Sequence, residues 1–146
     1  MDYTPEIRAT EFALAKSTLS VTPTSVFCGD TNIDTYPELE PLLSAGYVDS
    51  WLETHSDVAN SPNLREVGVT FGTVGLREYN SSIYNDGSPR RLDYAMVKGM
   101  KVVSCELVGN EPIPKEKWVE TSPQREWDLE VYVSDHLGIL IDVELA

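Results

Sequence analysis

Residues 25–32 of this chain read SVFCGDTN, and this stretch decides the fold. Its first four residues form a short apolar run, which predicts a buried strand. Gly29 and the polar residues Asp30 and Asn32 then end the strand abruptly. Carboxylate and amide side chains at a strand end are a common setting for chemistry in proteins that mix strands and helices. The stretch therefore predicts a mixed domain with a candidate site at residues 30–32.

Helix and strand patterns extend outward from this stretch on both sides. Helices are predicted at residues 5–19 and 36–45, and strands at 67–72, 91–97, 101–108 and 137–145, with a short strand or turn at 48–52. Residues 56–63 and 109–130 are expected to be irregular, and residues 73–89 to form a long loop of the kind that often carries function. Several strands follow one another without an intervening helix, so we expect antiparallel pairs and an α/β or α+β fold.

The first helix and the last strand show the clearest patterns. Thr4 can cap the helix, and Pro5 suits its first position. The apolar side of the helix is expected to hold Ile7, Phe12, Ala15 and Leu19, with Arg8, Glu11 and Lys16 facing water. The last strand alternates in the manner of a half-buried strand, with Leu137, Ile139, Ile141, Val143 and Leu145 on one face.

Length and charge limit the classes of function. A chain of 146 residues fits one domain, and its net charge of −13 argues against broad, unspecific binding to nucleic acid, which depends on Lys and Arg. A phosphate substrate stays open, because a bound divalent cation can invert the local field of an acidic site. The simpler interpretation is that the acidity only keeps the protein soluble.

The two cysteines, Cys28 and Cys105, lie in apolar runs and are expected to be buried, with no disulfide and a reducing compartment. The chain shows no signal peptide and no apolar run of membrane-spanning length, so we expect an intracellular protein, nuclear or cytoplasmic, that does not enter a membrane.

Three short segments place polar groups at strand ends: GDTN at residues 29–32, RLDY at 91–94 and SDHLG at 134–138. Each segment alone has an ordinary structural interpretation. The first could be a turn or helix cap, Asp93 could pair with Arg90 or Arg91, and His136 could be a structural histidine. Their combination is more specific than any one of them.

The residue types of these segments suit phosphodiester hydrolysis. Asp30 suits a general base that takes a proton from water, and Asn32 can orient that water or donate to a phosphoryl oxygen. His136 can donate to the phosphate, and a carboxylate such as Asp93 would orient it and raise its pKa. Asp135 suits coordination of a metal ion, for which Mg²⁺ is the expected cofactor and Mn²⁺ the alternative.

In this order, the three segments resemble the late motifs of the endonuclease/exonuclease/phosphatase (DNase I-like) superfamily, Gly-Asp-x-Asn, Arg-x-Asp-Tyr and Ser-Asp-His. Residues 27–33, 46–51, 69–71, 106–114 and 135–140 look like its tyrosyl-DNA phosphodiesterase 2 branch. The resemblance implies the carboxyl-terminal half of a four-layer α/β sandwich and a metal-dependent phosphodiesterase, whose substrate class includes DNA 5′ ends joined to tyrosine. It gives the same roles to Asp30, Asn32, Asp93, Asp135 and His136.

The resemblance also implies three substrate-binding residues. Thr70 and Phe71 match a segment that lines the substrate cleft, although a core-strand role suits Phe71 equally well. Arg91 is the third, and a surface ion pair is the preferred alternative for it. Asp49 and Trp51 match a recurrent Asp-x-Trp segment that is expected to support the site by packing.

The early motifs of the superfamily, an Asn and a Gln-Glu pair with the principal magnesium ligand, have no counterpart before Asp30. We therefore expect residues 1–146 to be one partial domain whose missing amino-terminal half would act in cis or in trans. Weak Mg²⁺ binding, very low activity and an exposed apolar sheet face should follow. The alternatives are a non-catalytic interaction module, an inactive fragment, or another substrate of the superfamily: abasic DNA, RNA tails, inositol phosphates or sphingomyelin.

Overall fold

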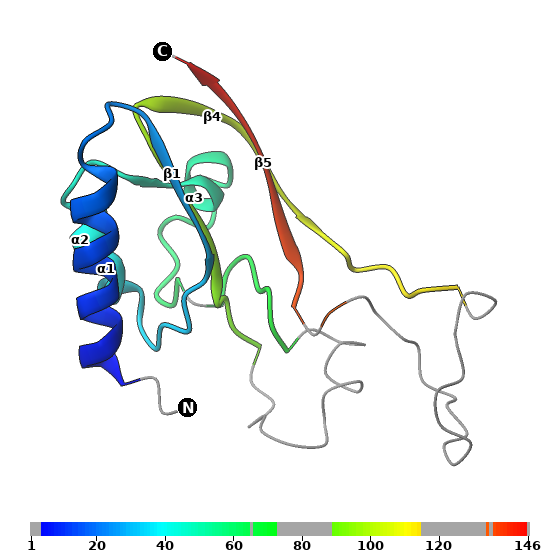
Figure 1. Ribbon diagram of the computed structural model, residues 1–146. Helices are drawn as coiled ribbons and strands as arrows, with labels where there is room; N and C mark the ends of the chain where they lie inside the picture. Colours follow the sequence, from blue (N-terminus) through cyan, green and yellow to red (C-terminus); the bar gives the residue numbers. More distant parts are fainter. Residues whose placement is uncertain (1–3, 65, 73–88, 115–133, 135, 146) are drawn as a thin grey trace.

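The computed structural model describes residues 4–64, 66–72, 89–114, 134 and 136–145. In chain order, its elements are α1 (Pro5–Leu19), β1 (Ser25–Asp30), the 3₁₀ helix η1 (Tyr36–Leu39), α2 (Glu40–Leu43), β2 (Val48–Asp49), α3 (Ser50–Thr54), β3 (Asp93–Lys98), β4 (Met100–Val108) and β5 (Gly138–Leu145) (Figure 1). All strand pairs among these elements are antiparallel, and the fold class is α+β. Within the described residues, no helix has the length and apolar character needed to cross a membrane.

Strand β3 is the centre of a three-stranded sheet, with β1 on one edge and β2 on the other. In the β1–β3 pair, Phe27 lies opposite Met96 and Asp30 lies opposite Asp93. Four consecutive residues of β3, from Tyr94 to Val97, are at most 5% exposed. Burial on both faces explains why this strand is a continuous apolar run instead of an alternating one.

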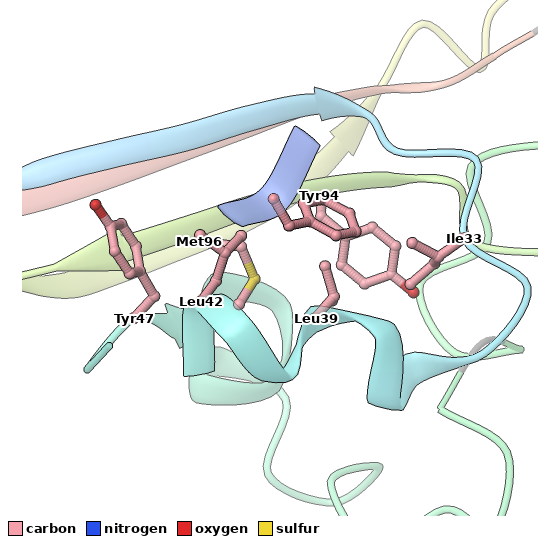
Figure 2. Close-up of a cluster of buried hydrophobic side chains, with 7 residues drawn as sticks. Ile33, Leu39, Leu42, Tyr47, Tyr94 and Met96 are labelled. Atoms are coloured by element: carbon pink, nitrogen blue, oxygen red, sulfur yellow. The ribbon is translucent and has the colours of Figure 1, made fainter. Parts of the chain in front are cut away.

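The main core lies between one face of this sheet and the helices. Figure 2 shows Tyr94 and Met96 of β3 above Leu39 and Leu42 of η1 and α2. Phe12 of α1 closes the cluster, with its ring edge-on to Phe27 at a centroid distance of 5.8 Å. The other buried members of this cluster are Ile33 and Tyr47.

Strands β4 and β5 form a long two-stranded ribbon, and its strand β4 contacts helix α3 (Figure 1). Gly99 makes the tight link from β3 into this ribbon. Its φ of +68° lies in the left-handed region, and an added Cβ would come within 2.2 Å of the Pro23 carbonyl oxygen. A side chain at this position would therefore both strain the backbone and collide with it.

The ribbon keeps several apolar side chains exposed. The predicted alternation of the last strand is present only as far as Ile141: Ile139 and Ile141 are half-buried, but Val143 and Leu145, predicted on the same face, are 38% and 78% exposed. The other exposed apolar residues of the ribbon are Val103, Val108 and Leu140.

Helix α1 has the predicted bounds but a different buried face. Ile7 is 49% exposed, whereas Arg8 is 3% exposed. Residues 8, 12, 15 and 19 share one face of the helix, and Arg8 is buried there because Glu38 and Asp34 bind its guanidinium at 2.8 and 2.7 Å. Thr4 occupies the cap position, although its side chain makes no cap hydrogen bond.

Two other predicted elements differ in form. The helix predicted at 36–45 is a 3₁₀ turn followed by one short α-helical turn, since Pro41 lies inside the predicted helix, where it removes a backbone donor. The strand predicted at 67–72 is reduced to isolated bridges of Phe71 with Arg90 and His136. Gly68 and Gly72, with φ values of +65° and +77°, interrupt the extended backbone there. The predicted loop at 73–89 lies almost entirely outside the described residues.

The expected burial of both cysteines is wrong for Cys28. Its side chain is exposed, because β1 is an edge strand and Cys28 lies on the face away from the helices. Cys105 is buried, and burial, with a further contribution from Asp49, raises the pKa of its thiol to about 11.

We therefore expect the two thiols to differ in reactivity. In the native chain at pH 8, a thiol reagent such as Ellman's reagent should modify Cys28 at once and Cys105 only after unfolding. Mass spectrometry of tryptic peptides identifies the modified residue, and Cys28→Ser is the control. Equal rapid labelling of both residues in the native state would contradict the described burial.

The buried ion pair of α1 has a pH dependence that can be tested. Burial alone would raise the pKa of Glu38, but hydrogen bonds from Arg8 and from the amides of Thr35 and Asp34 lower it below its ordinary 4.5. The stabilisation from ionised Glu38 is therefore complete above pH 4.5 and is lost as the pH falls through the lower folded pKa.

Glu38→Gln should accordingly reduce the free energy of unfolding by about 1–3 kcal/mol at pH 7. The difference from the wild type should shrink as the pH falls toward 3, and urea unfolding at several pH values measures it. Glu11→Gln, which changes an exposed carboxylate of α1, should show no such dependence. A gap between wild type and Glu38→Gln that stays constant with pH would contradict this linkage.

Candidate functional site

Three segments that lie far apart in the sequence meet at one end of the sheet. Asp30 ends β1, Asp93 begins β3, and His136 lies two residues before β5. One ligand-type atom from each of these side chains lies within 4.8 Å of the others. The structure thus brings together three of the five residues singled out from the sequence motifs.

Asp93 holds the imidazole of His136. Its Oδ2 lies 2.7 Å from Nδ1, and the two side chains are 18% and 22% exposed. An ionised carboxylate can only accept a hydrogen bond, so this contact assigns a proton to Nδ1 of His136. The second ring nitrogen, Nε2, does not take part in the contact with Asp93. The Phe71 ring lies 4.9 Å from the imidazole at 46°, and the hydroxyl of Ser134 accepts from the backbone N–H of His136 at 3.1 Å.

Asn32 binds the Asp30 carboxylate from within the same turn. Its backbone N–H donates to Oδ1 at 3.0 Å, and its side-chain amide donates to Oδ2 at 2.9 Å. Asn32 has a φ of +48°, in the left-handed region that asparagine tolerates better than most residues. The amide therefore orients the carboxylate, and Asp30 remains exposed at the surface.

The three residues predicted to bind substrate have different surroundings. Phe71 is half-buried beside His136, where it can contact a ligand. Thr70 is fully buried, and its hydroxyl accepts from the backbone amides of Leu92 and Asp93 at 3.1 Å each.

Arg91 lies in the interior instead of in the surface ion pair that the sequence favoured. It is 1% exposed, its guanidinium donates to both carboxylate oxygens of Asp49, and it stacks 4.2 Å from the centre of the Tyr94 ring. Burial alone would lower the pKa of Arg91, but the Asp49 carboxylate raises it, so the guanidinium stays charged. The Arg91 side chain therefore stabilises the interior through Asp49 and Tyr94.

Asp49 connects this ion pair to helix α3. Its carboxylate accepts from the backbone N–H of Trp51 at 3.0 Å, which caps the helix. Burial, and then the Asp49 carboxylate, raise the pKa of Tyr36 well above its ordinary value, so its phenol stays neutral. The support role that the sequence indicated for Asp49 is therefore a buried, charge-paired cap.

One supporting residue was not singled out from the sequence. Thr31 donates its backbone N–H and its hydroxyl to the Leu92 carbonyl, both at 2.8 Å. It occupies the variable position of the Gly-Asp-x-Asn motif, so only its position between two site residues could have indicated it.

The described side chains do not by themselves form a magnesium site. Mg²⁺ prefers six oxygen ligands in octahedral geometry, whereas this cluster offers two carboxylates and one imidazole. Both oxygens of Asp30 accept from Asn32, and Asp93 is bound to His136. Asp135, the predicted metal ligand, lies outside the described residues.

No family model matches this chain, and no curated protein is significantly similar to it.

The buried Arg91–Asp49 pair leads to a stability prediction. Asp49→Asn should reduce the free energy of unfolding by about 3–5 kcal/mol, because it leaves a buried guanidinium without its countercharge. Urea unfolding followed by fluorescence measures the change. Glu144→Gln breaks a surface pair with Lys101 whose side chains are 63% and 72% exposed, and it should have no measurable effect. Equal effects of the two substitutions would contradict the described burial.

Proposed function

We propose that this chain carries catalytic groups of a metal-dependent phosphodiesterase. The observation that supports this function best is the convergence of Asp30, Asp93 and His136 from three separate segments within 4.8 Å. A general base beside a carboxylate–histidine pair suits attack of water on a phosphodiester. The order of the three motifs in the sequence supports the same proposal.

The position of Asp30 supports its role as the base. It lies opposite Asp93 in the β1–β3 register, and like charges directly opposite each other destabilise a sheet. Local conflicts of this kind are typical of functional sites, where other interactions compensate for them. In the proposed reaction, Asp30 takes a proton from water as the water oxygen attacks phosphorus. The bond from phosphorus to the leaving oxygen breaks, and that oxygen departs with the electron pair as a phenolate that takes a proton from solvent.

His136 would stabilise the phosphoryl group during this attack. Asp93 accepts from Nδ1, so Nε2 is the ring atom that would donate to a phosphoryl oxygen when the imidazole is protonated on both nitrogens. A charge-assisted hydrogen bond of this kind is stronger than a neutral one. Phe71, beside the imidazole, offers an apolar surface for an aromatic leaving group such as tyrosine.

The proposal includes Mg²⁺, with Asp135 as one ligand and Mn²⁺ as an alternative. When bound, the ion would supply Lewis-acid neutralisation of the phosphoryl charge. DNA 5′-phosphotyrosyl ends are the proposed substrate, on the strength of the motif resemblance. The proposed setting is the nucleus or cytoplasm, where the free cysteines would stay reduced.

A non-catalytic interaction module is the second candidate function. The exposed apolar residues of the β4–β5 ribbon favour it, since such surfaces often mark sites of association. In that case, the Asp30 substitution would leave binding to a partner unchanged, and the chain would not hydrolyse phosphodiesters.

A single-turnover assay tests the proposed reaction. The chain, in large excess with Mg²⁺, is mixed with an oligonucleotide that carries a labelled 5′-phosphotyrosyl end, because an excess of protein reveals slow hydrolysis. We expect slow release of tyrosine, with a rate that falls about 100-fold or more in Asp30→Asn. Asp142→Asn is the matched control, since Asp142 lies on β5 and accepts from Ser104. No release by the wild type, or equal rates in Asp30→Asn, would refute the proposal.

A further inference from the structure

Thr70 makes more backbone contacts at the site than its place in an irregular segment would suggest. Its side chain is 0% exposed, and its hydroxyl oxygen accepts from two consecutive amides, those of Leu92 and Asp93. Both distances are 3.1 Å. A buried side chain that binds the N–H of Asp93 fixes the backbone from which the Asp93 carboxylate extends.

The backbone of the same residue reaches the histidine segment. The carbonyl of Thr70 accepts from the N–H of Leu137 at 2.8 Å, and its N–H donates to the carbonyl of Arg90 at 3.3 Å. The next residue, Phe71, bridges both Arg90 and His136. Thr70 is thus hydrogen-bonded to Asp93 itself and to the residue that follows His136.

Leu92 is held from two sides. Thr31 binds its carbonyl, and Thr70 binds its N–H. Because Thr31 follows Asp30 directly, the peptide of Leu92 connects the base, the carboxylate and the histidine through hydrogen bonds of 2.8 to 3.1 Å. Thr31 and Thr70 thus bind the carbonyl and the N–H of the same Leu92–Asp93 peptide group, but only Thr70 also binds Leu137, the residue that follows His136.

We propose that Thr70 is the positioning residue of the Asp93–His136 pair and not a substrate-binding residue. Its role in hydrolysis rests on the proposed function, but its effect on the pair does not. The hydroxyl binds the amide of Asp93, the carbonyl binds the N–H of Leu137 next to His136, and the two contacts together set the Asp93 Oδ2 to Nδ1 distance of 2.7 Å. Loss of the hydroxyl should release the imidazole from Asp93.

Nuclear magnetic resonance of the full chain tests this proposal without an activity assay. A carboxylate that accepts from Nδ1 shifts the imidazole N–H proton downfield and slows its exchange with water. The chain holds two histidines, so a His55→Gln background assigns the signal to His136. Thr70→Val should lose this signal, while Thr70→Ser, which keeps the hydroxyl, should retain it.

Thr31→Val is the matched control. It removes a buried threonine hydroxyl from the carbonyl of the Leu92–Asp93 peptide group, which the Thr31 N–H still binds, and it leaves the Asp93 N–H bound to Thr70. General destabilisation would affect both valine variants, whereas the His136 signal should disappear only in Thr70→Val. Persistence of the signal in Thr70→Val, or its loss in Thr70→Ser, would overturn the proposal.

A folding failure of Thr70→Val does not block the test. Thr70→Cys then replaces it, because sulfur is a weak acceptor in a side chain the size of serine. The cysteine variant should lose the signal that the serine variant keeps. Equal signals in these two variants would overturn the proposal.

The single-turnover assay separates this inference from the proposed function. In Thr70→Val the hydrolysis rate should fall about 10-fold to 100-fold. The protein concentration that gives half of the maximal rate should change less than about twofold. A displaced Asp93–His136 pair stabilises the transition state less well but should have little effect on substrate binding. A lost His136 signal in a chain that never hydrolyses substrate supports the positioning role and refutes the function. Hydrolysis that depends on Asp30 but is unaffected in Thr70→Val refutes the positioning role alone.

Discussion

Strand β3 must be buried on both faces and paired on both edges, and the rest of the described structure depends on this constraint. Tyr94 and Met96 fill the helix-facing core, whereas Ala95 and Val97 are buried on the opposite face. Apolar burial of this extent fixes the register of a strand strongly, because a shift by one residue would exchange its two faces. The register then places Asp93 opposite Asp30 whatever the electrostatic cost of that arrangement.

The supporting contacts compensate for this cost. At the entry to β3, Arg91 is paired with Asp49, and at the next two residues Thr31 and Thr70 hold the backbone. Each of these groups is buried and polar, and each is bound to a group that would otherwise lack a partner in the interior. The exposed carboxylate of Asp30 and the imidazole of His136 thus extend from backbone segments that buried hydrogen bonds hold in place.

The sequence predicted strands and helices well where one physical term dominates. Apolar runs placed β1, β3 and β4, and the alternation of residues 139–145 placed β5.

Prediction was weaker where the burial of a charged side chain depends on partners that lie far away in the sequence. Arg8 was expected in water, because its two partners follow some 30 residues later and a single helix cannot reveal them. Arg91 was placed at the surface for the same reason, since its partner Asp49 lies 42 residues away. The polar motifs indicated which residues meet, but the positioning role of Thr70 depends on backbone contacts that no side-chain pattern records.

The alternation of side chains along β1 also limits how a chain of this kind can change during evolution. Insertion of one residue between Ser25 and Asp30 would either turn Phe27 out of the core or move Asp30 to the helix-facing side of the sheet. Selection should therefore remove insertions and deletions in β1 even where it accepts substitutions. The connection between α3 and Thr70 has no such alternation to preserve. New lengths, and with them new surface contacts, can therefore accumulate in that connection while the spacing within β1 stays constant.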